Sequence, residues 1–297
     1  MTLSLPDFSA QVKNGYVSDT VLQQFRGFVF SYYRDFGRHD MEWRHTENPY
    51  LITVSEIMLQ QTQVSRVETV YPKFISLFPT AEALARASEA DVLSAWQGMG
   101  YNRRALSLQK LCRIIVNEYN GVFPKTPDEL VKLPGLGPAT SSSIAAFAYN
   151  YPAVFIETNI RRVFIHCFFR GRSEVDDSEI FPLVKAALPE NAREWYWALM
   201  DIGSAMKQSV ENPNRKSRQY VKQSAFEGSN RQLRGNVLKK MLEVKEADAA
   251  SLAGALGCGN DAVQNTLDTM VREGFFVCDT AGVYRMKGRE HESEKQA

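Results

Sequence analysis

Cysteine is scarce in this chain and widely scattered. The 297 residues include four cysteines, and no two lie within three positions of each other, so no CxxC pair exists. We therefore expect no thiolate metal site, and scattered single cysteines favour a reducing compartment. The N-terminus lacks a basic segment followed by an apolar one, so we expect no secretory signal.

Long apolar runs and net charge are also missing. No stretch approaches the ~20 apolar residues that a membrane-spanning helix needs. Lysine and arginine number 35 against 34 aspartates and glutamates, and hydrophobic residues make up 44% of the chain. This composition is ordinary for a globular protein of about two domains. It excludes secreted disulfide scaffolds, membrane proteins and long disordered chains.

The basic residues are unevenly distributed. Nine of them lie between residues 203 and 240, where only two acidic residues oppose them. Arg103, Arg104, Lys110 and Arg113 form a second run. Such clusters are typical of surfaces that bind nucleic-acid phosphates, although solvated helix faces are the plainer interpretation.

Helical patterns extend to about residue 225. Apolar residues recur at helical spacing, and two strong start signals are Ser88-x-x-Asp91 and Thr126-Pro127-Asp128-Glu129. No convincing strand pattern precedes residue 270. We therefore expect an all-α fold class for this part of the chain.

The remainder of the chain has a different organisation. Residues 211–230 are polar and weakly periodic, which predicts an irregular linker. Three short helices are expected next, followed by a two-stranded hairpin at 275–286. This order is typical of a winged helix-turn-helix, whose third helix would face a DNA major groove. A module that binds protein or only packs is the alternative.

Leu133-Pro134-Gly135-Leu136-Gly137 lies between two predicted short helices. Glycines at alternate positions allow a tight turn that exposes N–H groups beside a helix N-terminus, which suits a phosphate oxygen. The hairpin of a helix-hairpin-helix motif has this arrangement and holds a DNA backbone without reading sequence. The flanking helices favour that interpretation over a simple turn.

Two acidic residues are candidates for catalysis. Glu56 lies in an apolar segment, where desolvation would raise its carboxyl pKa and keep a proton available for general acid work. A solvated surface glutamate is the plainer alternative. Glu157 follows an apolar run, so it either caps a helix or faces Glu56 as a second carboxylate. Two carboxylates in different environments are usual in glycosidic cleavage.

Several motifs together resemble the helix-hairpin-helix DNA glycosylase superfamily, most closely its adenine glycosylase (MutY) branch. The similarity covers roughly half the chain, and MLQQTQV is typical of that branch. The matching segments are Trp43-Arg44 with Glu56 twelve residues later, SEIMLQQTQV (55–64), AWQGMGYNRRA (95–105), LPGLGPAT (133–140), Glu157 with Asn159 and Arg162-Val163, and MDIGSAM (200–206).

The resemblance implies roles for individual residues. Glu56 matches the acid that protonates the adenine leaving group at N7. Glu157 occupies the place of the catalytic aspartate that stabilises the oxocarbenium-like sugar, and Asn159 supports that site. Arg44 and Asp201 fall where the family lines the pocket for the flipped adenine.

The resemblance also implies contacts with DNA around the opposite base. Gln61 and Tyr101 match residues that intercalate there, and Thr62 and Met99 match residues that touch that base, typically 8-oxoguanine. When the target base is flipped out, intercalating side chains of this kind, here called wedges, occupy the space that it leaves among the stacked bases.

The hairpin is implied to hold DNA phosphate through Gly135, Gly137 and Ala139. Bifunctional relatives carry a lysine where this chain has Ala139, so Schiff-base strand cleavage through that position is not expected.

Most relatives hold an iron–sulfur cluster on four cysteines, for which this chain has Lys207, Asn214, Ser217 and Gln223. We therefore expect no iron–sulfur cluster and no other cofactor, except for a monovalent cation that the hairpin could bind. The basic loop around Arg215–Arg218 is still expected to meet DNA phosphate. The predicted winged helix stands in place of the Nudix-like domain with which MutY proteins usually end.

The expected architecture is a two-lobed helix-hairpin-helix glycosylase fold with the active site in the cleft between the lobes. Residues 1–49 with 154–228 would form one lobe and 50–153 the other. A small winged-helix domain would follow at 229–288, and 289–297 would be a disordered tail.

The expected function is a monofunctional base-excision-repair DNA glycosylase that hydrolyses the N-glycosidic bond of adenine opposite 8-oxoguanine or guanine, without lyase activity. A glycosylase for uracil or thymine in G mismatches is one alternative, and a non-catalytic DNA-binding protein on this scaffold is another. The expected partner is double-stranded DNA with a mispaired or damaged base. We expect a monomer without membrane contact, in the cytoplasm at the nucleoid or in a eukaryotic nucleus.

Overall fold

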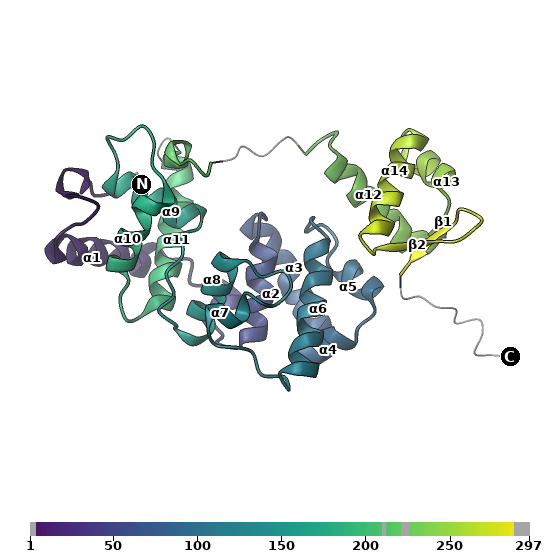
Figure 1. The fold of residues 1–297 in the computed structure, drawn as a ribbon, viewed down its shortest axis with the longest axis horizontal. Coiled ribbons are helices and arrows are strands. Elements are labelled where there is room, and N and C mark those ends of the chain that lie inside the picture. Colours follow the sequence, from purple (N-terminus) through teal and green to yellow (C-terminus); the bar gives the residue numbers. More distant parts are fainter. Residues whose placement is uncertain (1–3, 210–211, 221–225, 288–297) are drawn as a thin grey trace. The chain divides into compact units, whose positions relative to one another are not determined.

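The computed structural model describes residues 4–209, 212–220 and 226–287 (Figure 1). Contacts divide the chain into two compact units, residues 1–57 with 123–222 and residues 58–122 with 223–297. Helices dominate both, and within the described ranges every strand lies after residue 245, which confirms the expected all-α character of the preceding chain. The predicted domain boundaries stay a prediction, and the predicted tail lies outside the described residues.

Several helices of the first unit begin at recognisable side-chain caps. Ser18 Oγ accepts a hydrogen bond from the Val21 N–H, and Asp176 with Glu179 forms a capping box. No helix of the described chain is both long and apolar enough to cross a membrane. The elements are η1 (Ser9–Gln11), α1 (Asp19–Phe36), η2 (Glu42–Arg44), most of α2 (Pro49–Leu59), α7 (Pro127–Leu130), α8 (Pro138–Tyr149), α9 (Thr158–Phe168), α10 (Asp177–Ala187), α11 (Ala192–Ser209) and η3 (Pro213–Lys216).

The core of this unit is an aromatic cluster where α1, α9 and α11 meet (Figure 1). The Phe25 ring of α1 is fully buried and lies edge-on to Phe164 and Phe168 of α9, with centroid separations of 5.3 and 5.0 Å. Trp195 of α11 meets the same ring at 5.7 Å. Edge-to-face geometry is the favourable arrangement for aromatic pairs, so one phenylalanine joins the three helices.

The second unit begins with four helices. The N-cap that the sequence predicted at Ser88 is confirmed. Ser88 Oγ accepts from the Asp91 N–H at 3.1 Å and donates to the Asp91 carboxylate at 2.6 Å. Trp96 is fully buried against Phe74, with ring centroids 5.6 Å apart. The helices are α3 (Val64–Leu77), α4 (Ala81–Arg86), α5 (Glu89–Ala95) and α6 (Arg103–Glu118).

The C-terminal part of this unit contains the three predicted helices and the predicted hairpin. A third, two-residue strand that the sequence did not indicate completes an antiparallel sheet of order β1-β3-β2. The elements are α12 (Asn230–Val244), β1 (Glu246–Ala247), α13 (Ala249–Leu256), α14 (Asn260–Arg272), β2 (Phe276–Cys278) and β3 (Tyr284–Met286). Whether this segment is a winged helix-turn-helix stays a prediction.

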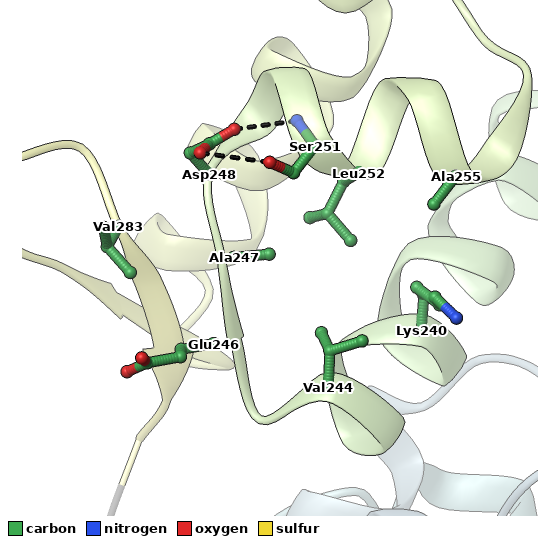
Figure 2. A pocket seen from close by; sticks show the side chains of 9 residues that line it. All are labelled: Lys240, Val244, Glu246, Ala247, Asp248, Ser251, Leu252, Ala255 and Val283. Carbon is green, nitrogen blue, oxygen red and sulfur yellow. Dashed lines mark hydrogen bonds between the residues drawn. The ribbon is translucent and has the colours of Figure 1, made fainter.

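A shallow groove of about 340 Å³ lies in the same segment, lined by residues of α12, β1 and α13 (Figure 2). Asp248 marks one edge, where its carboxylate accepts from the Ser251 N–H at 2.7 Å and caps α13. Leu252 and Val244 supply apolar surface at the groove.

We predict that Phe25→Ala destabilises the protein by about 3–5 kcal/mol, because the substitution leaves a cavity where three helices meet. Phe36→Ala is the matched control, because Phe36 lies on the same helix but is 56% exposed. Its cost should stay below about 1 kcal/mol. Urea denaturation of both variants measures the difference, and equal costs would contradict the assigned core.

Candidate functional site

Glu56 lies on α2 among buried apolar residues of the first unit. Its neighbours Val54 and Ile57 are fully buried, while Glu56 itself is partly buried. Ser143 on α8 is buried and donates its hydroxyl to Glu56 Oε2 at 2.6 Å. The segment following the hairpin motif therefore supplies the partner of the candidate acid, a residue that sequence reasoning missed.

The pKa of the Glu56 carboxyl is raised from its ordinary value to about 7, chiefly by burial. The Ser143 hydrogen bond and the charge of Arg44 oppose this rise, and the negative charge of Glu157 adds to it. A carboxyl group with this pKa is substantially protonated near neutral pH. It can therefore donate a proton, as a general acid must.

Glu157 is the N-cap of α9, as the plainer of its two interpretations predicted. Its Oε1 accepts from the backbone N–H groups of Asn159 at 2.8 Å and Ile160 at 3.0 Å. Burial raises the pKa of this carboxyl, while these N–H groups work to lower it. Since the Glu157 charge also acts on Glu56, the second interpretation, two interacting carboxylates, is compatible with the first.

A hydrogen-bonded chain continues from Glu157 into the helix pair behind it. The Asn159 amide lies 3.4 Å from Glu157 Oε2, and its Oδ1 accepts from Arg162 Nη1 at 3.0 Å. The same Arg162 nitrogen donates to the Gly203 carbonyl of α11. A Cβ at Gly203 would lie 2.5 Å from Asn159 Cβ, so glycine is required for this approach. The helix packing thus fixes the position of Asn159.

Arg44 and Asp201 form a buried pair with two parallel hydrogen bonds, each 2.8 Å long. Their side chains are 4% and 2% exposed. Arg38 adds a bond of 2.6 Å to Asp201 Oδ1. Burial works to raise the pKa of Asp201, but Arg44 and Arg38 outweigh it and hold the pKa below its ordinary value. Asp201 is thus a charged anchor for Arg44, whose charge reaches Glu56.

The glycine hairpin has the expected form. It links α7 to α8, Gly135 adopts φ +85°, and Gly137 is the N-cap of α8. Gly135, Gly137 and Ala139 are all exposed. Because Pro138 has no N–H, Ala139 supplies the first N–H of α8, beside the positive end of the helix dipole. The geometry is suited to a phosphate oxygen.

The residues at the expected iron–sulfur positions do not fit a cluster. Asn214 is buried and donates from Nδ2 to the Thr158 carbonyl at 2.9 Å. Ser217 pairs through its backbone with Val175, and Gln223 lies outside the described residues. None of the four is a thiolate ligand. Among the described residues, no three His, Cys, Asp or Glu side chains converge to hold a metal ion.

The remaining predicted residues lie on two loops of the second unit. Gln61 and Tyr101 both adopt positive φ, at 54° and 46°, which costs a non-glycine residue on the order of 1 kcal/mol. Gln61 is exposed and Tyr101 is 40% exposed. Thr62 donates to the Gln60 carbonyl at 3.2 Å. Met99 is only 4% exposed, so its side chain belongs to the core of this unit.

The structure thus arranges the predicted residues in two groups. The first unit brings together Glu56, Glu157, Asn159, Arg44 and Asp201, with Gly135, Gly137 and Ala139 preceding the helix that holds Ser143. The second unit carries Gln61, Thr62, Met99 and Tyr101. Sequence reasoning missed Ser143 and Arg38, because hydroxyls and arginines are common on surfaces. Only the sequence position of Ser143 after the hairpin could have indicated it.

Residues 54–181 match the HhH-GPD family, which is described as "HhH-GPD superfamily base excision DNA repair protein". The chain carries an HhH-GPD domain. The resemblance that the motifs indicated is therefore confirmed, and the HhH-GPD domain includes Glu56, the glycine hairpin and Glu157.

The relatives of this HhH-GPD domain include adenine DNA glycosylases. The chain is 38% identical over 181 residues to the adenine DNA glycosylase of Mycolicibacterium smegmatis, covering 60% of this chain and 61% of that protein. It is 34% identical over 178 residues to that of Buchnera aphidicola subsp. Baizongia pistaciae, covering 59% and 51%. The chain therefore spans little more than half the length of the curated relatives it matches.

A solved structure of a thermostable thymine-DNA glycosylase is also similar, with a TM-score of 0.56 and 25% identity. The similarity covers 63% of this chain and 87% of that one. The helix-hairpin-helix glycosylase fold expected from the sequence is thereby confirmed.

We predict that the free energy of unfolding of the Glu56→Gln variant rises relative to that of the native protein as pH increases. Because the folded pKa is raised, the folded protein holds the Glu56 proton at pH values where the unfolded chain has released it. The native protein therefore loses stability between about pH 4.5 and pH 7, and the glutamine variant does not. The relative gain should be about 2–3 kcal/mol.

Urea denaturation of both proteins at about pH 5 and about pH 8 measures this gain. A stability difference that is independent of pH would contradict the raised pKa of Glu56.

Proposed function

We propose that this protein is a monofunctional base-excision DNA glycosylase that removes adenine mispaired with 8-oxoguanine or guanine. The observation that carries the proposal is the pair of interacting carboxylates, Glu56 and Glu157, within an HhH-GPD domain. Their environments differ, since Glu56 meets a buried hydroxyl and Glu157 meets helix N–H groups. Two carboxylates that lie in different environments commonly divide the acid and stabiliser roles in glycosidic cleavage.

In the proposed mechanism Glu56 protonates N7 of the flipped adenine, which makes the base a better leaving group. Glu157 then stabilises the positive charge that develops on the sugar. Its Oε1 is committed to two backbone N–H groups, so Oε2 is the oxygen suited to face that charge. The bond between adenine and the sugar C1′ then breaks with its electron pair going to the base, and water adds to C1′ and releases its proton to solvent. Ala139 supports a reaction without lyase activity, since it offers no amine for a Schiff base.

The proposed partner is double-stranded DNA with a mispaired base. The exposed hairpin at Gly135 and Gly137 would hold a phosphate, and the exposed Arg215 and Arg218 would add positive charge in the same unit. Each phosphate contact releases counterions, so binding should weaken as salt rises. Helix α14 is a poorer candidate for DNA contact, because Asp261 and Asp268 are exposed on it. These charges favour packing or protein binding for the C-terminal module.

A second candidate function is excision of thymine or uracil from G mismatches. The similarity to a thymine-DNA glycosylase structure supports it. The motif MLQQTQV and the adenine glycosylase relatives favour adenine. A substrate panel separates the two functions.

We predict that the protein releases adenine in a single-turnover assay on duplexes with A opposite 8-oxoguanine or guanine. Strand breaks should appear only after alkali, because the position directly after the hairpin is Ala139 and not a lysine. Duplexes with U or T opposite G, and a matched duplex, complete the panel. Release of uracil or thymine alone would establish the second function, and binding without any release would indicate a non-catalytic protein.

We predict that Glu56→Gln retains affinity for a mismatched duplex but excises adenine at least ~100-fold more slowly, because the amide cannot supply the proton. Glu68→Gln, an exposed glutamate on α3, is the matched control and should keep both properties. Electrophoretic mobility shifts and single-turnover rates measure the two quantities separately. Excision by Glu56→Gln at the native rate would refute Glu56 as the acid.

A further inference from the structure

Arg104 is directed into the second unit, although the sequence places it in an exposed basic run. Its guanidinium is partly buried, with its Cζ 5.6 Å from the ring centroid of Trp96 and 5.5 Å from that of Tyr101. Burial lowers its pKa to about 10, so the group still carries its charge at neutral pH. The adjacent Arg103 is exposed. The two arginines therefore serve different purposes.

The Arg104 guanidinium joins two loops that are distant in sequence. Nη1 donates to the carbonyls of Met58 and Gln60, and Nη2 donates to Thr62 Oγ1 at 3.0 Å. Nη2 also lies 3.1 Å from the Met99 carbonyl and 3.2 Å from the Gly100 carbonyl. One side chain thus holds residues 58–62 and 99–100 together.

Each of these loops carries a residue in the left-handed region next to a bond from Arg104. Gln61 lies between the acceptors Gln60 and Thr62, and Tyr101 follows the acceptor Gly100. Left-handed conformations of non-glycine residues persist where the surroundings fix them. The planar fork of a guanidinium can bind several acceptors at fixed angles, whereas a lysine ammonium cannot reproduce that geometry.

We infer that Arg104 is a positioning residue for recognition of the base opposite the excised one, because it fixes the loop of Gln61 and the loop of Tyr101 relative to each other. The inference deepens the proposed function and rests on it, since those two side chains are the proposed wedges at the opposite base. Wedges held in register can distinguish a mispair from a matched pair. Wedges that move independently of each other lose that distinction.

The test compares Arg104→Gln and Arg104→Lys with Arg86→Gln. Arg86 is exposed on α4 of the same unit, so its substitution removes one guanidinium without touching the loops. Lysine keeps the positive charge of Arg104 and loses the fork, so it separates charge from geometry. Thermal melting identifies any variant that fails to fold. If Arg104→Gln fails to fold, the comparison of Arg104→Lys with Arg86→Gln serves as the test.

The first measurement is hydrogen–deuterium exchange of the free proteins. We expect faster exchange at 58–62 and 98–101 in both Arg104 variants, while Arg86→Gln matches the native protein. This measurement needs no activity, so it remains decisive for loop fixation even if the native protein excises no base. Native exchange rates at both loops in the Arg104 variants would overturn the inference.

The second measurement is the ratio of the dissociation constants for matched and mismatched duplexes. We expect that ratio to fall about tenfold or more in Arg104→Lys, through weaker binding of the mismatched duplex, while affinity for the matched duplex is unchanged. A general structural defect would weaken both equally, and that result would overturn the inference. So would an unchanged ratio accompanied by faster loop exchange.

A third measurement determines the same ratio of dissociation constants for Arg104→Ala with and without free guanidinium ion in solution. Partial recovery of the duplex ratio is expected, because the ion can reoccupy the space between the loops. No recovery in a folded Arg104→Ala protein would count against the guanidinium as the element that fixes them. Failure of the native protein to excise any base would instead refute the proposed function, while loop exchange would still report on Arg104.

Discussion

The close approach of α9 and α11 at Gly203 is the constraint on which the arrangement of the first unit depends. There is no room for a side chain at Gly203, and its carbonyl accepts from Arg162. Arg162 in turn bonds Asn159, whose amide lies beside Glu157. Two residues before Gly203, Asp201 anchors Arg44. Helix α11 therefore helps to position one polar group that acts on Glu56 and one that lies beside Glu157.

The two carboxylates differ because their surroundings differ. Burial of Glu56 in an apolar part of α2 favours its neutral form, against the opposing effect of the hydrogen bond from the Ser143 hydroxyl. Glu157 receives two N–H groups at the positive end of α9, which favour its charged form against burial. The negative charge of Glu157 raises the pKa of Glu56 further.

The loop of residues 212–217 is held against the start of α9 by hydrogen bonds that its asparagines make. Asn214 bonds the Thr158 carbonyl at the start of α9, and Asn212 Oδ1 lies 3.4 Å from Arg162 Nε. Backbone pairing with Val175 supports the loop from its other side. Asparagine side chains thus connect this loop directly to the helix that Glu157 caps.

The sequence by itself determined the local structure and the chemical motifs. Caps such as Ser88, the hairpin glycines and the order of the helices follow from interactions between residues a few positions apart, which the sequence displays directly. Burial and pairing depend on residues that are distant in sequence. Only the tertiary structure could decide that Ser143 meets Glu56, that Asp201 is committed to Arg44, and that Arg104 turns inward while Arg103 stays exposed. A basic or hydroxyl side chain has the same local signature in either environment, and the free energy that separates the two comes from long-range packing.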